Sequence, residues 1–88
     1  MIKSWTDKAW DDFNEWVIPD KKALKKITNL LKSIDRDGYN CIGHPEPLKH
    51  ALSGYWSVAI DKKNRLVFRI ENDEIIKIIQ CGTHYGDK

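Results

Sequence analysis

Hydrophobic residues near the start of the chain follow helical spacing after a short β-rich segment. Residues 2–5 form a candidate strand. Aromatic and aliphatic residues in 10–17 then recur every three to four positions, so that they share one face of a helix. Thr6 is a residue type that caps helix N-termini, and Pro19 favours a helix end at or just before it. This stretch therefore predicts a strand followed by one short helix.

A second helical stripe of leucine and isoleucine occupies residues 24–34. Asp20 is suited to cap the start of this helix, and Gly38 favours its end. Lysines surround the apolar stripe on the remaining faces. We expect the two helices to form an antiparallel pair.

The second half of the chain changes to the period of two that is typical of β-strands. Residues 39–47, which contain Gly43 and two prolines, are predicted to form a loop. The pattern then predicts strands at 55–60, 65–71 and 75–81, with a hairpin loop at 61–64 and a turn at 72–73. The last strand is apolar on both faces, which predicts that it lies inside the sheet or is covered.

The elements together predict an α+β fold in the order β-α-α-β-β-β. Two N-terminal helices would pack on one face of a twisted, mostly antiparallel sheet. Alternation in the strand 65–71 places Leu66 and Phe68 on one face, and Arg65 and Arg69 on the other. At 88 residues, the chain is interpreted as one domain over 1–88 with a single core.

The tryptophans sort into core and undecided positions. Trp10, Trp16 and Trp56 are predicted to lie in the core. The position of Trp5 stays open. His44 is predicted to be a surface residue of the loop.

Composition excludes several classes of protein. Hydrophobic residues make up 41% and charged residues 32%, a balance typical of globular rather than disordered chains. No apolar run approaches the ~18–20 residues that span a bilayer. The first residues lack the apolar centre of a signal peptide, so we expect a soluble, cytoplasmic protein. Cys41 and Cys81 are isolated, which indicates two reduced, partly buried thiols rather than a zinc or redox site.

Positive charge is concentrated in one segment. The formal net charge is only +2, but residues 21–36 carry five lysines and one arginine against a single aspartate. This basic block could face a polyanion or an acidic protein partner. It could equally be a solvated helix face, and the sequence does not decide between them.

Polar residues suited to proton transfer and phosphate binding gather near the ends of the predicted strands. They are Glu46, Lys49, His50, Arg65, His84 and Tyr85. Adjacent antiparallel strands can bring such ends to one edge of a sheet. The set suits the cleavage of RNA by its own 2′-hydroxyl. That reaction needs a base, an acid for the leaving 5′-oxygen, and cations that stabilise the charge on the phosphate.

In that chemistry Glu46 would be the base and His84 the acid. Arg65 would hold the phosphate through two parallel hydrogen bonds. Lys49 would add a point charge, and Tyr85 would stack on a base. A surface acid, a capping histidine and a salt-bridged arginine would leave the same pattern, so spacing alone leaves both interpretations open.

The segment 45–57, PEPLKHALSGYWS, resembles the signature of the Txe/YoeB toxins within the RelE-like superfamily. Residues 64–68 are similar to the HRLVY strand of that family, and 84–85 to its terminal HY. The resemblance covers about residues 1–85. It implies the RelE-like microbial ribonuclease fold and ribosome-dependent cleavage of messenger RNA in the A site, without a metal or cofactor.

The resemblance also implies the roles just given for Glu46, Arg65, His84 and Tyr85. It further implies which partners the protein has. It adds His50 to Lys49 as a residue that contacts RNA or supports the site. The expected partners are a YefM-like antitoxin, the ribosome with its messenger RNA, and a second copy of the chain. No membrane partner is expected.

Two neighbouring positions depart from the family, and the second of them bears on activity. The family reads WSRRI where this chain has Val58 and Ala59 in place of both arginines. The second arginine is normally counted with the catalytic cations. Loss of one such contact costs ~2–4 kcal/mol of transition-state stabilisation. We therefore expect an attenuated enzyme, whether the alanine is natural or engineered.

Two alternatives stay open at this stage. One is a catalytically disabled toxin homologue that binds antitoxin or ribosome, or represses its own operon together with the antitoxin. The other, weaker alternative is a basic RNA-binding module without a partner.

Overall fold

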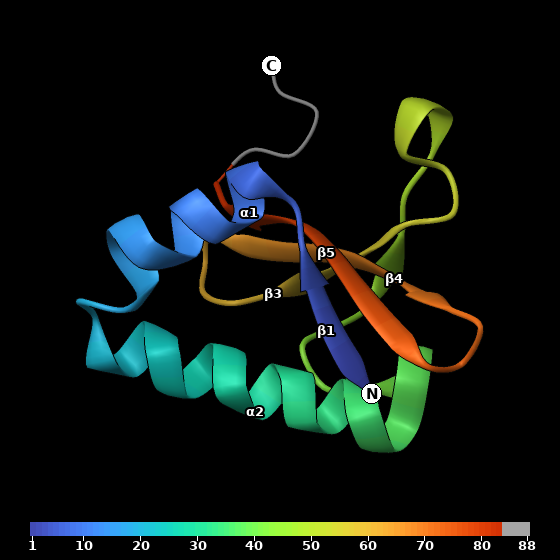
Figure 1. Ribbon diagram of the computed structural model, residues 1–88, viewed down its shortest axis with the longest axis horizontal. Coiled ribbons are helices and arrows are strands. Elements are labelled where there is room, and N and C mark those ends of the chain that lie inside the picture. Colours follow the sequence, from blue (N-terminus) through green and yellow to red (C-terminus); the bar gives the residue numbers. More distant parts are fainter. Residues whose placement is uncertain (84–88) are drawn as a thin grey trace.

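The computed structural model describes residues 1–83, in which the helices lie against a single sheet (Figure 1). His84 and Tyr85 lie outside the described residues. The elements in chain order are β1 (Ile2–Trp5), α1 (Asp7–Asp12), the π-helix η1 (Phe13–Val17), α2 (Lys21–Asp37), the 3-10 helix η2 (Gly38–Asn40), β2 (Glu46–Pro47), the 3-10 helix η3 (His50–Leu52), β3 (Trp56–Ala59), β4 (Arg65–Glu71) and β5 (Ile75–Gly82).

Side-chain caps begin both helices, as the sequence predicts. The Thr6 hydroxyl accepts a hydrogen bond from the Ala9 amide at 3.2 Å. The Asp20 carboxylate accepts from the amides of Lys22 and Ala23 at 3.0 and 3.2 Å. Gly38 ends α2 with φ at +60°. The first helix differs in one respect, because it continues from Phe13 to Val17 as a π-helix.

The sheet has the order β1-β5-β4-β3-β2. β1 runs parallel to β5, and all other neighbours are antiparallel. β5 is paired on both sides, which confirms the interior position predicted from its apolar faces. The prediction of four strands was wrong by one, because Glu46–Pro47 forms a two-residue strand inside the predicted loop. Pro47 has no amide hydrogen to donate, which suits a position at the edge of the sheet.

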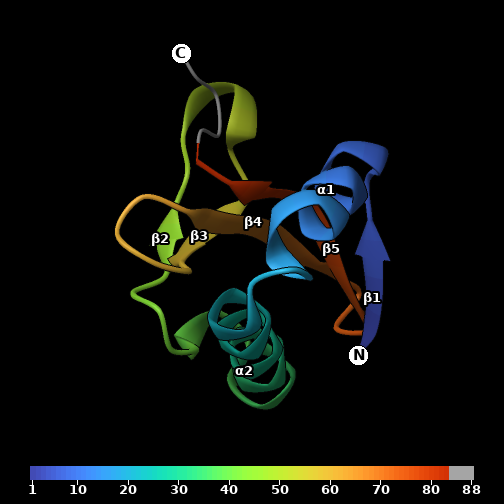
Figure 2. The same ribbon diagram turned by 90° about the vertical axis from the view of Figure 1, so that its left-hand side faces the viewer.

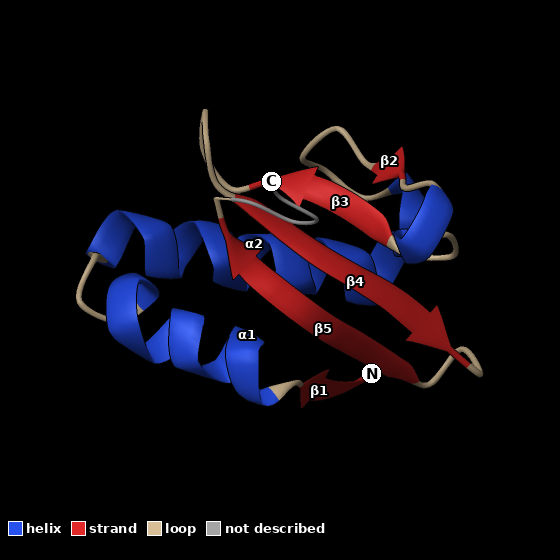
Figure 3. Cartoon of the chain, turned by 90° about the horizontal axis from the view of Figure 1, so that it is seen from above, coloured by secondary structure: helices blue, strands red, loops and turns tan. Residues whose placement is uncertain are grey.

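Both helices pack on the same face of the sheet, which confirms the predicted α+β architecture. α2 runs beneath β3 and β4 (Figure 2). The core combines Ala9 of α1, Leu30 of α2 and the strand residues Val58, Leu66 and Phe68, all fully buried. The predicted alternation in β4 is therefore confirmed, and its arginines lie on the other face. Viewed from above in Figure 3, the strands lie in front of α2.

Two of the three tryptophans that were predicted to lie in the core pack against it. Trp16 and Trp56 pack against the core as partly buried side chains. Trp10 was predicted to be buried but is 49% exposed. It lies outside the core on a cluster with Trp5 and Phe13, at ring-centroid distances of 5.8 Å to each. Helical spacing alone could not separate this satellite cluster from the core.

Both cysteines are free, as expected, and both are buried more completely than the partial burial predicted. His44 is exposed, also as predicted. Within residues 1–83 no helix has the length and apolar character needed to cross a membrane.

Gly43 lies where the loop before β2 touches the core. Its φ is +93°, and its carbonyl accepts a hydrogen bond from the Ala59 amide at 2.8 Å. A Cβ atom at this position would lie 2.9 Å from Cδ2 of Leu30 and 3.1 Å from Cβ of Val58. A side chain at position 43 would therefore require Leu30, Val58 or the loop itself to shift.

We predict that Gly43→Ala destabilises the protein by about 1–3 kcal/mol more than Gly54→Ala in urea unfolding. Gly54 is the matched control, because its φ is +95° but no atom lies within 4 Å of the added Cβ. Both variants carry the backbone strain, and only Gly43→Ala adds the contact with the core. Equal losses of unfolding free energy in the two variants would contradict this account.

Candidate active site on the open face of the sheet

The strand register brings the candidate residues of β2, β3 and β4 to one face. Glu46 pairs with Ser57, and Ala59 pairs with Arg65. Paired residues on neighbouring strands project from the same face of a sheet. We call this face the open face. It lies opposite the helices and is formed by Glu46, Ser57, Ala59 and Arg65 together with their neighbours on β4 and β5.

Arg65 is held in place by Ser57. Nε of Arg65 donates a short hydrogen bond to Oγ of Ser57, and Nη2 lies 3.4 Å from the Ser57 carbonyl oxygen. Ser57 is fully buried, and the Arg65 side chain is 26% exposed. Within residues 1–83, the other N–H groups of this guanidinium have no hydrogen-bond partner. The arginine is thus fixed on its inner side and can offer donors on its outer side.

Glu46 reaches the same guanidinium from the edge of the sheet. Its Oε1 atom lies 4.0 Å from Nη2 of Arg65, and its side chain is 64% exposed. An exposed pair at this distance stabilises the fold little. Pro45 and Pro47 restrict the backbone on either side, so the carboxylate is held near Arg65 while it stays open to solvent.

Lys49 and His50 lie in the loop between β2 and β3. Both are exposed, and η3 begins at His50, whose φ of +58° is unusual for a residue with a side chain. In the described part of the chain, no hydrogen bond or ion pair joins either residue to Glu46 or Arg65. The structure therefore brings Glu46 and Arg65 together and places Lys49 and His50 on the adjoining loop.

Ala59 is half-buried directly beside Arg65. It points away from Val58, which lies in the core. Alternation along β3 therefore places position 59 on the open face, away from the core. A cationic side chain at this position would stand next to the Arg65 guanidinium, and alanine supplies none.

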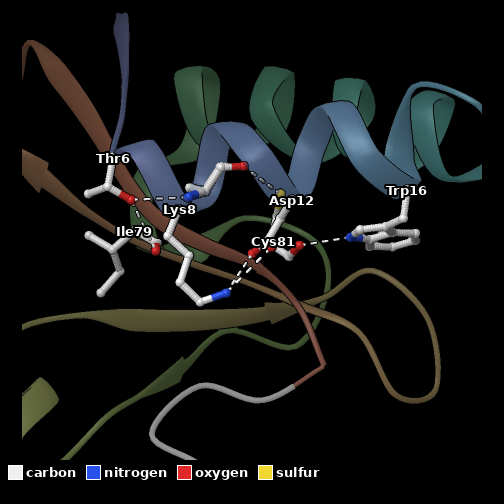
Figure 4. A network of polar contacts seen from close by, with 7 residues as sticks. Thr6, Lys8, Asp12, Trp16, Ile79 and Cys81 are labelled. Atoms are coloured by element: carbon white, nitrogen blue, oxygen red, sulfur yellow. Dashed lines mark hydrogen bonds and ion pairs between the residues drawn. The ribbon is translucent and has the colours of Figure 1, made fainter.

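The end of β5 is tied to the first helix. Gly82 pairs with Arg65, so the chain leaves β5 next to the site. Figure 4 shows the contacts that hold this end: Nε1 of Trp16 donates to the Cys81 carbonyl at 2.9 Å, and the Thr6 hydroxyl donates to the Ile79 carbonyl at 3.3 Å. The two candidates that follow, at positions 84 and 85, lie outside the described residues.

A cleft of about 650 Å³ opens beside this strand end. Lys8 and Asp12 of α1, Lys63 of the β3–β4 loop, and Gly82 and Thr83 are among the residues that line it. Lys8 and Asp12 form an ion pair at 3.2 Å. Cations and carboxylates are thus mixed in the cleft, whereas the open face offers the Arg65 guanidinium toward solvent.

Sequence reasoning missed Ser57 as the residue that positions Arg65. A signal was present, because the strand alternation places Ser57 on the same face as Arg65. The pairing of the two strands was needed to place the hydroxyl next to the guanidinium.

The comparisons with known proteins agree on one family. Residues 5–85 match the family model described as YoeB-like toxin of bacterial type II toxin–antitoxin system. Toxin YoeB of Escherichia coli K12 is 42% identical over 81 residues, which cover 92% of this chain and 95% of that protein.

Two solved structures from Staphylococcus aureus are also similar. A YoeB–YefM complex contains a chain that is 41% identical, with a TM-score of 0.87 and coverage of 97% of this chain and 98% of that one. A YoeB dimer gives 43% identity, a TM-score of 0.86 and the same coverage.

The burial of Cys81 gives a prediction for its reactivity. Burial raises the pKa of the Cys81 thiol to about 12, with the Asp12 carboxylate adding to the shift, and the thiol donates to the Ala9 carbonyl at 3.4 Å. Burial likewise raises the pKa of Cys41. At pH 8 both thiols stay protonated in the folded protein, and thiolate is the reactive form.

We predict that iodoacetamide at pH 8 leaves Cys81 unlabelled in the folded chain and labels it fully in urea, as measured by mass spectrometry. The urea-unfolded chain is the control. Labelling of native Cys81 as fast as in urea would contradict the packing of β5 against α1.

Proposed function

We propose that this chain, which belongs to the YoeB-like toxins of bacterial type II toxin–antitoxin systems, is an endoribonuclease that cuts messenger RNA in the ribosomal A site. The observation that carries the proposal is the pair of Glu46 and Arg65 on the open face, with the arginine fixed by Ser57. A carboxylate and an oriented guanidinium within 4.0 Å of each other can act on one phosphodiester.

The proposed reaction uses the 2′-hydroxyl of the RNA. Glu46 accepts the hydroxyl proton while the 2′-oxygen forms a bond to phosphorus. Arg65 stabilises the added negative charge on the phosphate oxygens. The bond from phosphorus to the 5′-oxygen breaks, and His84 donates a proton to that oxygen. The products are a 2′,3′-cyclic phosphate and a 5′-hydroxyl.

The remaining site residues would bind the substrate. Tyr85 stacks on a base, and Lys49 and His50 contact RNA or support the site. The proton transfers and the charge stabilisation are assigned to side chains, so the proposed reaction is independent of a metal. The 64% exposure of Glu46 supports access by a substrate as large as RNA.

Dependence on the ribosome is supported by the sparseness of the site and by the basic face of α2. The exposed lysines of this face are Lys21, Lys22, Lys25 and Lys32, and none forms an ion pair within residues 1–83. Thr28 and Asn29 are exposed between them. Hydroxyl, amide and ammonium groups are typical phosphate ligands, and a peptide partner would need apolar anchors. We assign this face to ribosomal RNA, which implies a cytoplasmic protein.

The proposed protein partners are a YefM-like antitoxin and a second copy of the chain. The S. aureus YoeB–YefM complex and YoeB dimer support both by similarity.

The absence of a cation at position 59 supports an attenuated enzyme. It also favours one second candidate function, that of a disabled toxin that binds its antitoxin or the ribosome, or acts as co-repressor of its operon. These two functions differ in whether the unaltered chain cuts.

We predict that Ala59→Arg raises the cleavage rate by roughly 10²–10³-fold, because it returns a cation next to Arg65. The measurement is primer extension on a translated message, with and without ribosomes. Ala59→Gln is the matched control, because it adds a side chain without charge and should leave the rate unchanged.

The outcomes separate the candidate functions. Cuts by the unaltered chain within A-site codons support the enzyme. Cuts only by the arginine variant support the disabled binder. If neither form cuts although both are folded, the endoribonuclease proposal is wrong. Equal rates for Ala59→Arg and the unaltered chain would reject attenuation.

We predict that Lys25→Gln with Lys32→Gln weakens ribosome binding and lowers the slope of log affinity against log salt by about one unit per lysine. Lys62→Gln with Lys63→Gln is the control with the same change in net charge. The measurement is a binding titration with vacant ribosomes at several salt concentrations. An equal loss in both double variants would reject a specific role for α2, and a loss of antitoxin binding instead would assign its basic face to the antitoxin.

A further inference from the structure

A second polar cluster lies on the open face beyond the proposed cleavage site. Cζ of Arg69 lies 4.8 Å from the centre of the Tyr55 ring. Nε and Nη2 of Arg69 donate to the same oxygen of Glu71 at 3.0 and 2.6 Å. The guanidinium is thus held at one side by a carboxylate and placed over an aromatic ring.

The cluster belongs to the same face as Arg65. Alternation along β4 projects Arg65, Val67 and Arg69 from one face, opposite Leu66 and Phe68 in the core. Four residues of strand separate the two arginines by about 13 Å. Tyr55 is tied to the segment after Glu46 by the hydrogen bond from the Leu48 amide to its carbonyl at 2.9 Å.

The contacts of Arg69 contribute little to the stability of the fold. Arg69 and Glu71 are 37% and 32% exposed, and ion pairs that are open to water stabilise proteins only slightly. The ion pair also makes Arg69 a poor phosphate ligand, because Glu71 neutralises it. The cluster thus exposes part of a planar guanidinium that Glu71 holds at one side and that lies over the Tyr55 ring.

Such planes are the surfaces on which proteins stack single-stranded bases. Aromatic rings and arginine guanidinium groups both serve in this way, and unstacked RNA bases are the usual ligands. We propose that Tyr55 and Arg69 form a stacking subsite for the base of a nucleotide next to the one that is cut. This inference rests on the proposed function, because it needs a single RNA strand to lie along the open face.

Glu71 is the positioning residue of this subsite. It fixes the guanidinium, whereas Tyr55 and Arg69 contact the base. The subsite stabilises the bound strand before and during cleavage, so its loss should weaken binding more than it slows the chemical step.

The test measures affinity for ribosomes whose vacant A site holds an uncuttable message with a deoxyribonucleotide codon. We expect Tyr55→Ala and Arg69→Lys each to weaken binding roughly 5- to 150-fold. Arg69→Lys keeps the charge and loses the plane. Tyr55→Phe keeps the aromatic ring, so it should weaken binding less than Tyr55→Ala does. Thermal unfolding of each variant checks that it is folded.

Binding to a message that lacks a single base tests the subsite more specifically. Removal of the base that stacks on the subsite should weaken binding by the unaltered chain and have no further effect on Tyr55→Ala. A merely structural role would give independent, additive losses at every message position, and that result would overturn the inference. Full affinity of Arg69→Lys would also overturn it.

Failure of the proposed function gives a different result. In that case neither the unaltered chain nor Ala59→Arg cuts the corresponding all-ribonucleotide message on programmed ribosomes, and the subsite is rejected together with the proposed function. If the unaltered chain binds and the variants bind equally well, only the subsite is wrong.

Discussion

The hydrogen bond between Arg65 and Ser57 depends on the register of β3 against β4, and the candidate site depends on that bond. Side chains alternate between the two faces of a strand, so a slip by one residue would move Arg65 toward the helices and Leu66 toward solvent. The core opposes such a slip, because Leu66, Phe68 and Val58 are all fully buried beneath the sheet. The packing of one face thus fixes the arrangement of the other.

One face of the sheet forms the core and the other carries the candidate site, which explains how a small chain can keep one sheet face for binding. Both helices cover the same face, and the core lies between them and the strands. The opposite face carries Arg65, Arg69 and the row that begins at Glu46. The basic face of α2 lies on the other side of that helical layer, so the proposed cleavage site and the proposed ribosome contact occupy different surfaces and need not compete.

Much of the fold could be predicted from local patterns, and less of the site. Periods of 3.6 and 2 located the helices and the longer strands, and the caps at Thr6 and Asp20 followed from side-chain chemistry. The strand at Glu46–Pro47 could not be predicted, because two residues carry no period and their pairing with β3 arises only in the folded chain. The same pairing brings Glu46 to Arg65, which spacing alone left open. The prediction for Trp10 failed for a different reason. Helical spacing predicts that Trp10 shares a helix face with other apolar residues, but it does not predict whether the core covers that part of the face.

The central claim is that this open face promotes attack by the RNA's own 2′-hydroxyl, and a single atom of the substrate tests it. The measurement is cleavage of two translated messages that differ only by a 2′-deoxy nucleotide at the attacked position of the A-site codon, using the Ala59→Arg form for the greatest signal. The account predicts that the normal message is cut to a 2′,3′-cyclic phosphate end and that the deoxy message stays intact. Cleavage of both messages at the same bond would contradict it.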